Sequence, residues 1–178
     1  MEVDLRIRHA VPEDAEGITR CHVGGWKVHY RGILPDDFLD AIDADERCAA
    51  RRRMLEEADP TRRNWVLEEG GEIRGWAAAG PARDDDLGDG SWELYAIYLD
   101  PARVGEGYGR ALMTHCVNEA EAAGRAEMVM WVLTGNERAR RFYAAAGFRE
   151  DERVAARPFG DTGQTKLRMR RGLAGGDA

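Results

Sequence analysis

Three glycines at alternate positions form a candidate anion-binding loop in the middle of the chain. Gly105, Gly107 and Gly109 lie between an apolar, strand-like stretch and an amphipathic segment typical of a helix. Because glycine has no Cβ atom, such a loop can bring its backbone N–H groups close to a ligand. The N-terminus of the following helix carries a partial positive charge that favours an anion. The spacing therefore predicts a binding loop for phosphate groups.

The same spacing excludes two common nucleotide-binding loops. A P-loop ends in Gly-Lys-Ser or Gly-Lys-Thr, whereas Gly109 is followed by Arg110 and Ala111. The dinucleotide fingerprint has two residues between its second and third glycines, whereas here Tyr108 alone separates Gly107 from Gly109. The loop resembles instead the acetyl-CoA loop of the GNAT superfamily of N-acetyltransferases.

A second motif, from Asn136 to Phe148, resembles the closing motif of that superfamily. Asn136 is a predicted helix N-cap, and Gly147 is a predicted left-handed cap at the other end. One face of the helix is formed by residues at the spacing i, i+3, i+4 and i+7: Ala139, Phe142, Tyr143 and Ala146. Alone, this motif would favour a core helix with a buried tyrosine. Two motifs in this order favour the resemblance.

The resemblance implies that acetyl-CoA binds as a co-substrate along both motifs and the strand before them. The residues implied in this binding are Tyr98, Leu99, Val104, Gly105, Gly107, Tyr108, Gly109, Arg110, Asn136 and Tyr143. Tyr98 and Leu99 are expected to pair with the pantetheine arm as an extra strand. Val104 and Glu106 depart from the family pattern, because members usually carry Gln or Arg before the first glycine and a basic residue after it. We expect weaker binding of the diphosphate, for which Arg103 or Arg110 would compensate.

The implied chemistry is direct attack of a neutral amine on a thioester. Since an alkylamine is protonated at neutral pH, a base must remove its proton, and Glu93 is the candidate. The alternative is a partly exposed carboxylate at the end of a strand. Alternation along that strand predicts that Glu93, Tyr95 and Ile97 share one face. By resemblance, Tyr143 is the general acid toward the departing thiolate, and backbone N–H groups near Leu99 polarise the acetyl carbonyl.

An aromatic segment before the first motif resembles the acceptor side of bacterial members. Trp26, His29 and Tyr30 would line the acceptor pocket, although Trp26 and Tyr30 are equally explained as core aromatics. Asp36, Asp37 and the run 84–86 with Asp89 would favour a cationic amine, such as a polyamine, an aminoglycoside-like drug or a protein N-terminus. For the run 84–86, a solvated and flexible loop tip is the simpler interpretation.

Composition limits the remaining choices. The chain has 178 residues and a net charge of −7, which argues against nucleic acid as a partner. No apolar run approaches the roughly 20 residues needed to span a bilayer, and no signal peptide is evident, so we expect a cytoplasmic protein. The three cysteines lack the spacing of a metal site, and neither a metal nor an acyl-enzyme is expected. A homodimer through the terminal strands is plausible by symmetry.

The order of predicted elements indicates one mixed α/β domain over residues 1–171, followed by a disordered tail over 172–178. We expect strands at about 5–7, 64–68, 72–80, 91–99, 127–133, 147–155 and 165–170, and helices after Pro12, over 36–57, after Gly107 and over 137–146. The resemblance implies a mostly antiparallel, twisted sheet of about six to seven strands flanked by about four helices. The implied function is N-acetyl transfer to a small-molecule or peptide amine. The alternative is a non-catalytic acetyl-CoA-binding sensor.

Overall fold

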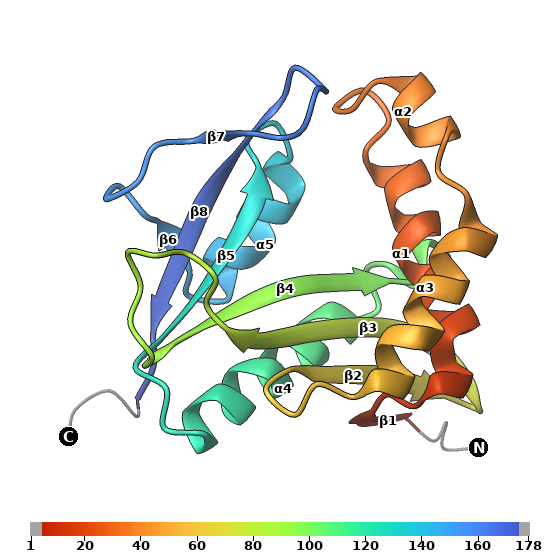
Figure 1. Ribbon diagram of the computed structural model, residues 1–178, viewed down its shortest axis with the longest axis horizontal. Helices are drawn as coiled ribbons and strands as arrows, with labels where there is room; N and C mark the ends of the chain where they lie inside the picture. The colour runs from red at the N-terminus through yellow and green to blue at the C-terminus, as the bar shows by residue number, and fades with distance from the viewer. Residues whose placement is uncertain (1–4, 175–178) are drawn as a thin grey trace.

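A sheet of eight strands forms the centre of the structure, a computed structural model that describes residues 5–174 (Figure 1). The strands are β1 (Leu5–His9), β2 (Arg63–Glu69), β3 (Glu72–Pro81), β4 (Ser91–Leu99), β5 (Glu127–Leu133), β6 (Arg149–Glu150), β7 (Arg157–Pro158) and β8 (Thr165–Gly172). The α-helices are α1 (Ala15–His29), α2 (Asp36–Asp40), α3 (Ala44–Glu57), α4 (Tyr108–Ala122) and α5 (Glu137–Ala145). The expected mixed α/β fold is confirmed.

The sheet divides into two parts that diverge between β4 and β5. Its order is β1-β2-β3-β4-β5-β8-β6, with β7 paired to β8, and every pair is antiparallel except β4 with β5. That parallel pairing is confined to residues 91–93 of β4 and 127–129 of β5. Beyond it the two strands separate, as Figure 1 shows. The C-terminal half of β4 therefore has a ladder partner, β3, on one side only.

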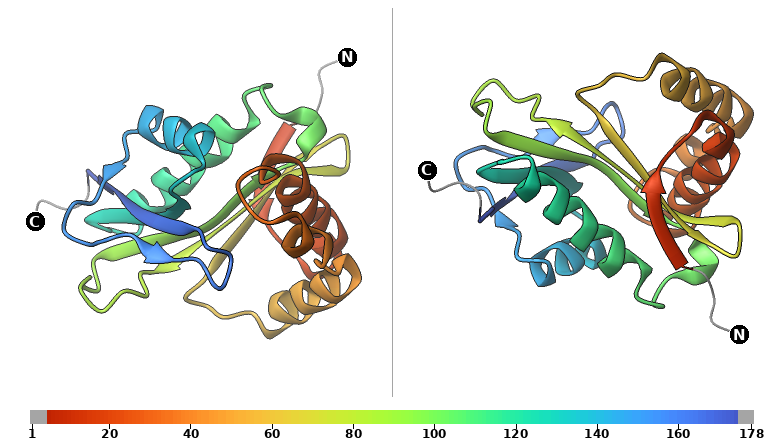
Figure 2. Two further views of the ribbon diagram at one scale, coloured as in Figure 1. Left: turned by 90° about the horizontal axis from the view of Figure 1, so that it is seen from above. Right: turned by 90° about the horizontal axis from the view of Figure 1, so that it is seen from below.

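Helices cover both faces of the sheet (Figure 2). On one face, α1 packs through Ile18 and Cys21 onto β2 and β3, where Val66, Ile73 and Trp76 are buried. On the other face, α4 and α5 cover a larger core. Its buried α4 residues are Leu112, Met113, Cys116, Val117 and Ala120. The apolar period predicted for the second motif is correct, because Ala139, Phe142, Tyr143 and Ala146 all pack against this core.

The helical region expected over residues 36–57 is two helices rather than one. Helix α2 ends at Asp40, and Asp43 begins α3 as its N-cap. The Asp43 carboxylate accepts hydrogen bonds from the N–H groups of Asp45 and Glu46, at 2.9 and 3.0 Å. An aspartate that binds these free N–H groups favours a new helix start over continuation. Five α-helices result where about four were expected.

The disordered tail predicted from Gly172 begins too early. Gly172 is the last residue of β8 and pairs with Glu127 of β5. Leu173 is buried, and its N–H donates to the Ala126 carbonyl at 2.9 Å. Burial of an apolar side chain and a backbone hydrogen bond order these positions despite the glycine-rich composition. Residues 175–178 lie outside the described part of the chain.

The acidic loop between β3 and β4 is attached to the sheet by one buried arginine. Arg168 of β8 has a fully buried side chain. Its guanidinium donates to Asp84 at 2.9 Å, to Asp86 at 2.5 and 2.8 Å, and to Asp151 at 2.9 Å. We call these four residues the Arg168 cluster. The interpretation of residues 84–86 as a solvated tip is wrong for Asp84 and Asp86, because both carboxylates bind a buried cation.

The carboxylates of the Arg168 cluster also accept hydrogen bonds from residues outside it. Asp84 also accepts from Arg157 at 2.7 Å and from the indole N–H of Trp131 at 2.9 Å. Burial raises the pKa of Asp84, but the hydrogen bonds from Arg168, Arg157 and Trp131 outweigh burial and hold the pKa below its ordinary value. The pKa of Asp151 is strongly lowered by its hydrogen bond from Arg153, with Arg168 adding to the effect. The three carboxylates of the Arg168 cluster are therefore ionised at neutral pH.

Candidate active site

The glycine loop has the backbone shape that its sequence predicts. Gly105 and Gly107 have positive φ values of 99° and 89°, and Gly107 is the N-cap of α4. A Cβ atom at either position would contact nothing, so conformation and not space requires glycine there. At Gly109 the reason is packing, because a Cβ would lie 3.3 Å from Leu99 and 3.4 Å from Phe142. The loop thus presents the N-terminus of α4 without side chains in front of it.

Substituting Gly107 with alanine tests this loop. A left-handed backbone costs an L-residue about 1–2 kcal/mol, so the binding conformation becomes less populated. We expect the dissociation constant for acetyl-CoA to rise about tenfold, since 1.4 kcal/mol corresponds to that factor. Calorimetric titration measures it. The control is Gly88→Ala, at an exposed position with an ordinary φ and open space around it. Equal affinities of the two variants would contradict the role of Gly107.

The side chains of two residues at the glycine loop, Arg103 and Tyr108, are bound to Glu69 of β2. Arg103 donates to Glu69 at 2.5 Å and to the Tyr108 hydroxyl at 2.8 Å, and it lies 3.2 Å from Glu106. The Tyr108 hydroxyl also hydrogen-bonds to Glu69. These contacts turn both side chains toward the β2–β3 turn. The charge of Arg103 is therefore already compensated by carboxylates, which leaves Arg110 as the other arginine expected to supply positive charge.

A groove between α4 and α5 leads away from the glycine loop. It is lined by Gly105, Gly107, Gly109, Arg110, Met113, Thr114, Arg138, Phe142, Ala145, Ala146 and Arg171, with Leu99 and Val104 at its inner end. Within residues 5–174, no carboxylate forms an ion pair with Arg110, Arg138 or Arg171. Of these three arginines, Arg110 was the one expected at the cofactor from the sequence. The three arginines and the α4 N-terminus suit a polyanion such as the diphosphate of coenzyme A.

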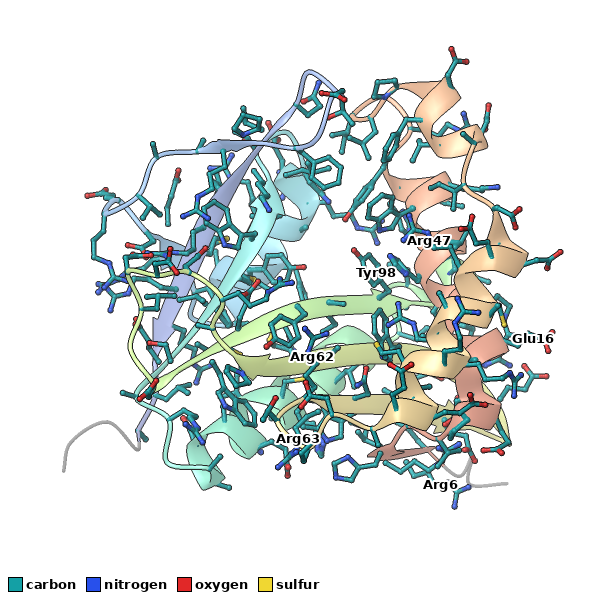
Figure 3. All side chains as sticks on the ribbon, in the orientation of Figure 1. Arg6, Glu16, Arg47, Arg62, Arg63 and Tyr98 are labelled. Carbon is teal, nitrogen blue, oxygen red and sulfur yellow. The ribbon has the colours of Figure 1, made fainter. Side chains whose placement is uncertain are left out.

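A central channel joins this groove to the opening between β4 and β5. Its walls are Gly25, His29 and Tyr30 of α1, Ile97, Tyr98 and Leu99 of β4, and Asn136, Arg138, Ala139, Phe142 and Tyr143 around α5, with Val104 and Gly109 at the loop. The backbone of β4 beyond residue 93 is not paired to β5 along this channel. An extended amide chain can therefore pair with it as an added strand. Tyr98 lies at the end of β4 beside α1 and α3 (Figure 3).

Tyr143 lies where the channel meets a further cavity. It lines both spaces, as do Tyr30, Ile97 and Tyr98. Burial, with a smaller effect of Tyr98, raises the pKa of Tyr143 above its ordinary value of 10. Burial likewise raises the pKa of Tyr30, with Tyr98 and Tyr143 adding to it. Both phenols are therefore hydrogen-bond donors throughout the physiological range. Asn136 caps α5, its Oδ1 accepting from Ala139 at 3.1 Å.

A bulge in β4 changes which side chains share a face. Ala78 pairs with Ala96, but Ala79 pairs with Leu94, so Tyr95 is an extra residue in β4. Leu94 and Ile97 pack on the α4 side, whereas Ala96 packs on the α1 side. The predicted alternation is therefore wrong, since Ile97 does not share a face with Tyr95. Uniform alternation assumes an unbroken ladder, and nothing local in the sequence marks the extra residue.

Glu93 is a buried carboxylate that lines the further cavity. It is 3% exposed, which rules out the alternative of a partly exposed strand end. Its oxygens accept from the Arg83 guanidinium at 3.0 and 2.5 Å and from the Arg83 N–H at 3.2 Å. The Arg83 side chain is 59% exposed. The ion pair is therefore open to solvent from its arginine side.

The further cavity, which we call the acceptor cavity, lies between the separated strands. Trp26 and Tyr30 line it, together with Trp131 of β5 and Phe159 before β8. Trp26 contacts Phe159 with ring centroids 6.1 Å apart. His29, expected in this wall, lines the central channel instead. Its Nδ1 lies 3.2 Å from Arg138, and burial followed by Arg138 lowers its pKa.

Three of the aspartates expected to attract a cation are paired within the protein. Asp36 lies 2.9 Å from Arg31, and Asp84 and Asp86 belong to the Arg168 cluster. Neither these three nor Asp37 and Asp85 line the acceptor cavity. The aspartates therefore give no reason to expect a polyamine in this cavity.

Residues 5–174 contain no group of three or more His, Cys, Asp or Glu side chains placed to hold a metal ion. Over the same span, no helix has the length and apolar character needed to cross a bilayer.

Comparison with known proteins gives one consistent family. The model of the acetyltransferase (GNAT) family matches residues 29–148. The uncharacterized N-acetyltransferase YuaI of Bacillus subtilis is 33% identical over 134 residues, which are 74% of this chain and 73% of the relative. The L-methionine sulfoximine/L-methionine sulfone acetyltransferase of Salmonella typhimurium is 32% identical over 146 residues, which are 81% of this chain and 80% of that protein.

A solved structure extends this similarity to the fold. The YncA protein of Salmonella typhimurium, described with its cofactor acetyl-CoA, superposes with a TM-score of 0.68. It is 26% identical and covers 96% of this chain and 94% of its own. The family and the enzymes named among the relatives indicate that this protein is an acetyltransferase. The chain belongs to the acetyltransferase (GNAT) family.

Proposed function

We propose that this protein transfers an acetyl group from acetyl-CoA to the primary amine of a small molecule, directly and within one ternary complex. The observation that carries the proposal is the continuity of three spaces. The groove at the glycine loop shares Leu99 and Phe142 with the central channel, and the channel shares Tyr98 and Tyr143 with the acceptor cavity. A cofactor entering from one end and an amine from the other would meet at Tyr143.

Direct transfer is favoured by where the cysteines lie. Cys21 and Cys116 are fully buried, and burial raises the pKa of Cys21 to about 12. Cys48 is on α3. None of the three lines the groove, the channel or the acceptor cavity. A thiol that is neither ionised nor adjacent to the acetyl group cannot serve as the nucleophile.

Two proton transfers are assigned to residues of this chain. Glu93 accepts the proton of the incoming ammonium, directly or through water. The neutral amine then attacks the acetyl carbonyl, whose oxygen is polarised by backbone N–H groups near Leu99. Tyr143 donates its phenolic proton to the departing thiolate. The nitrogen thus loses one proton to Glu93 before attack and a second as the intermediate collapses, and this second proton replaces the one that Tyr143 gives to the sulfur.

Glu93→Gln tests the first of these steps. The amide keeps the shape of the side chain but cannot accept a proton at neutral pH. We expect kcat/KM for the amine to fall at least about tenfold, toward the low end of general-base effects. Acetyl-CoA affinity should not change, because Glu93 does not line the groove or the channel. An unchanged kcat/KM would remove Glu93 from the mechanism.

The name of one relative supports amino acids and their analogues as the first acceptors to examine, since it is an acetyltransferase of methionine sulfoximine. The test is calorimetric titration with acetyl-CoA, followed by thiol release in the presence of free amino acids and simple amines. Micromolar binding and amine-dependent thiol release would support the proposal. No binding at millimolar acetyl-CoA, or binding without amine-dependent release, would overturn it.

A further inference from the structure

The charges that line the acceptor cavity are few. Among its lining residues only Arg83, Glu93 and Lys166 are ionisable to a full charge at neutral pH; the others are apolar or aromatic. An apolar wall with a small number of charged groups is the usual form of a site that orients one polar ligand. The sign and pairing of these three side chains therefore indicate which ligand fits.

Two of the three charges compensate each other. The Arg83 guanidinium donates twice to the Glu93 carboxylate, at 3.0 and 2.5 Å, in a bidentate arrangement. Such a pair has little net charge at the distance of a ligand. The third charge, on Lys166, determines the net charge of the cavity.

Lys166 has no anionic partner in the part of the chain that the structure describes. It lies on β8 opposite Leu133 of β5, and its Nζ is 5.2 Å from the centre of the Trp131 ring. Of the ion pairs found between residues 5 and 174, none includes Lys166. The Asp84 carboxylate accepts from the indole N–H of Trp131, but its ion pairs are with Arg157 and Arg168. No carboxylate of the Arg168 cluster therefore pairs with Lys166.

Lys166 is therefore the one charged side chain of the acceptor cavity that is not paired with another residue among 5–174. Its positive charge favours a ligand that carries oxygen acceptors with negative charge.

We infer that Lys166 binds a carboxylate of the acceptor, so that the enzyme selects amines that carry an anionic group over amines that do not. This inference rests on the proposed function. An α-amino acid has the required pair of charges, with its ammonium toward Glu93 and its carboxylate toward Lys166. A polyamine would place additional positive charge beside Lys166 and is disfavoured.

The experiment compares L-amino acids with the amines that lack only the α-carboxylate, such as L-methionine with 3-(methylthio)propylamine. Wild-type protein, Lys166→Met and Lys166→Arg are assayed for kcat/KM with each member of each pair. We expect the wild type to prefer amino acids, and Lys166→Met to lose about tenfold or more for them, as for a charged hydrogen bond. The same variant should retain its rate with the decarboxylated amines, and Lys166→Arg should restore part of the preference.

The other lysine of the chain provides a matched control. Lys27, in the last turn of α1, lines none of the three spaces, so Lys27→Met should behave as wild type. Preference of the wild type for decarboxylated amines, or equal loss on both members of a pair in Lys166→Met, would overturn the inference while leaving acetyl transfer intact. Transfer to neither member, or no binding of acetyl-CoA, would overturn the proposed function as well.

Discussion

Tyr143→Phe is expected to lower kcat about 100- to 1000-fold, within the range of general-acid effects. The substitution removes only the hydroxyl, so the ring still packs against Phe142 and Phe148, whose centroids lie 5.4 and 6.4 Å away. Without the phenolic proton, the thiolate departs unprotonated from a buried site. The acetyl-CoA dissociation constant should remain within about twofold, because the backbone and the cations of the groove are unchanged.

Steady-state thiol release and calorimetric titration separate these two effects. The pH dependence of kcat gives an independent test. The pKa of Tyr143 is raised above its ordinary value of 10, so the phenol stays protonated up to about that pH. In the wild type, kcat should therefore not decline between pH 8 and pH 10 through loss of this proton. A kcat for Tyr143→Phe equal to that of the wild type would exclude the assigned role.

Arg168→Met is expected to reduce the free energy of unfolding by about 3–5 kcal/mol, the usual cost of removing one partner from a buried ion pair. Methionine fills a similar volume but leaves Asp84 and Asp151 without their buried cation. Arg62→Met is the control, since Arg62 forms one exposed pair with Asp59 at 3.5 Å and should change stability by less than about 1 kcal/mol. Urea denaturation measures both variants.

The pH dependence of this effect has a definite sign. Hydrogen bonds lower the pKa values of Asp86 and Asp151 in the folded state below the ordinary carboxyl value of 3.8. Their contribution to stability is therefore complete above that value and is lost as the pH falls below it. The difference between wild type and Arg168→Met should shrink below about pH 4. A difference that stayed constant down to pH 2 would show that the cluster does not stabilise the fold through charge.

Features encoded by neighbouring residues could be predicted from the sequence. The positive φ values of Gly105 and Gly107 follow from glycine itself, and the N-cap at Asn136 and the apolar face of α5 follow from residue type and helical period. The two motifs together gave the family, which the comparisons confirm, and the family implied the mostly antiparallel sheet. In each of these cases the signal lies within about a dozen residues.

Features that depend on distant residues could not be predicted. The bulge at Tyr95 arises from the register between β3 and β4, which no local pattern specifies. Arg103 looked available for a diphosphate because its partner, Glu69, is 34 residues away in the sequence. Arg168 and Asp84 are 84 residues apart, so the aspartate run had only its local composition to suggest a role. Charge-pairing over such separations requires the fold to be known.

The residues that stabilise the wall of the acceptor cavity are different from those that face its ligand. Arg168 binds Asp84, Asp86 and Asp151, none of which lines the cavity, whereas Arg83 and Lys166 do line it. Lys166, which faces the cavity and takes part in no ion pair among residues 5–174, can therefore be exchanged without loosening the loop that Arg168 holds. The range of acceptors can change at this position while the stability of the fold is retained.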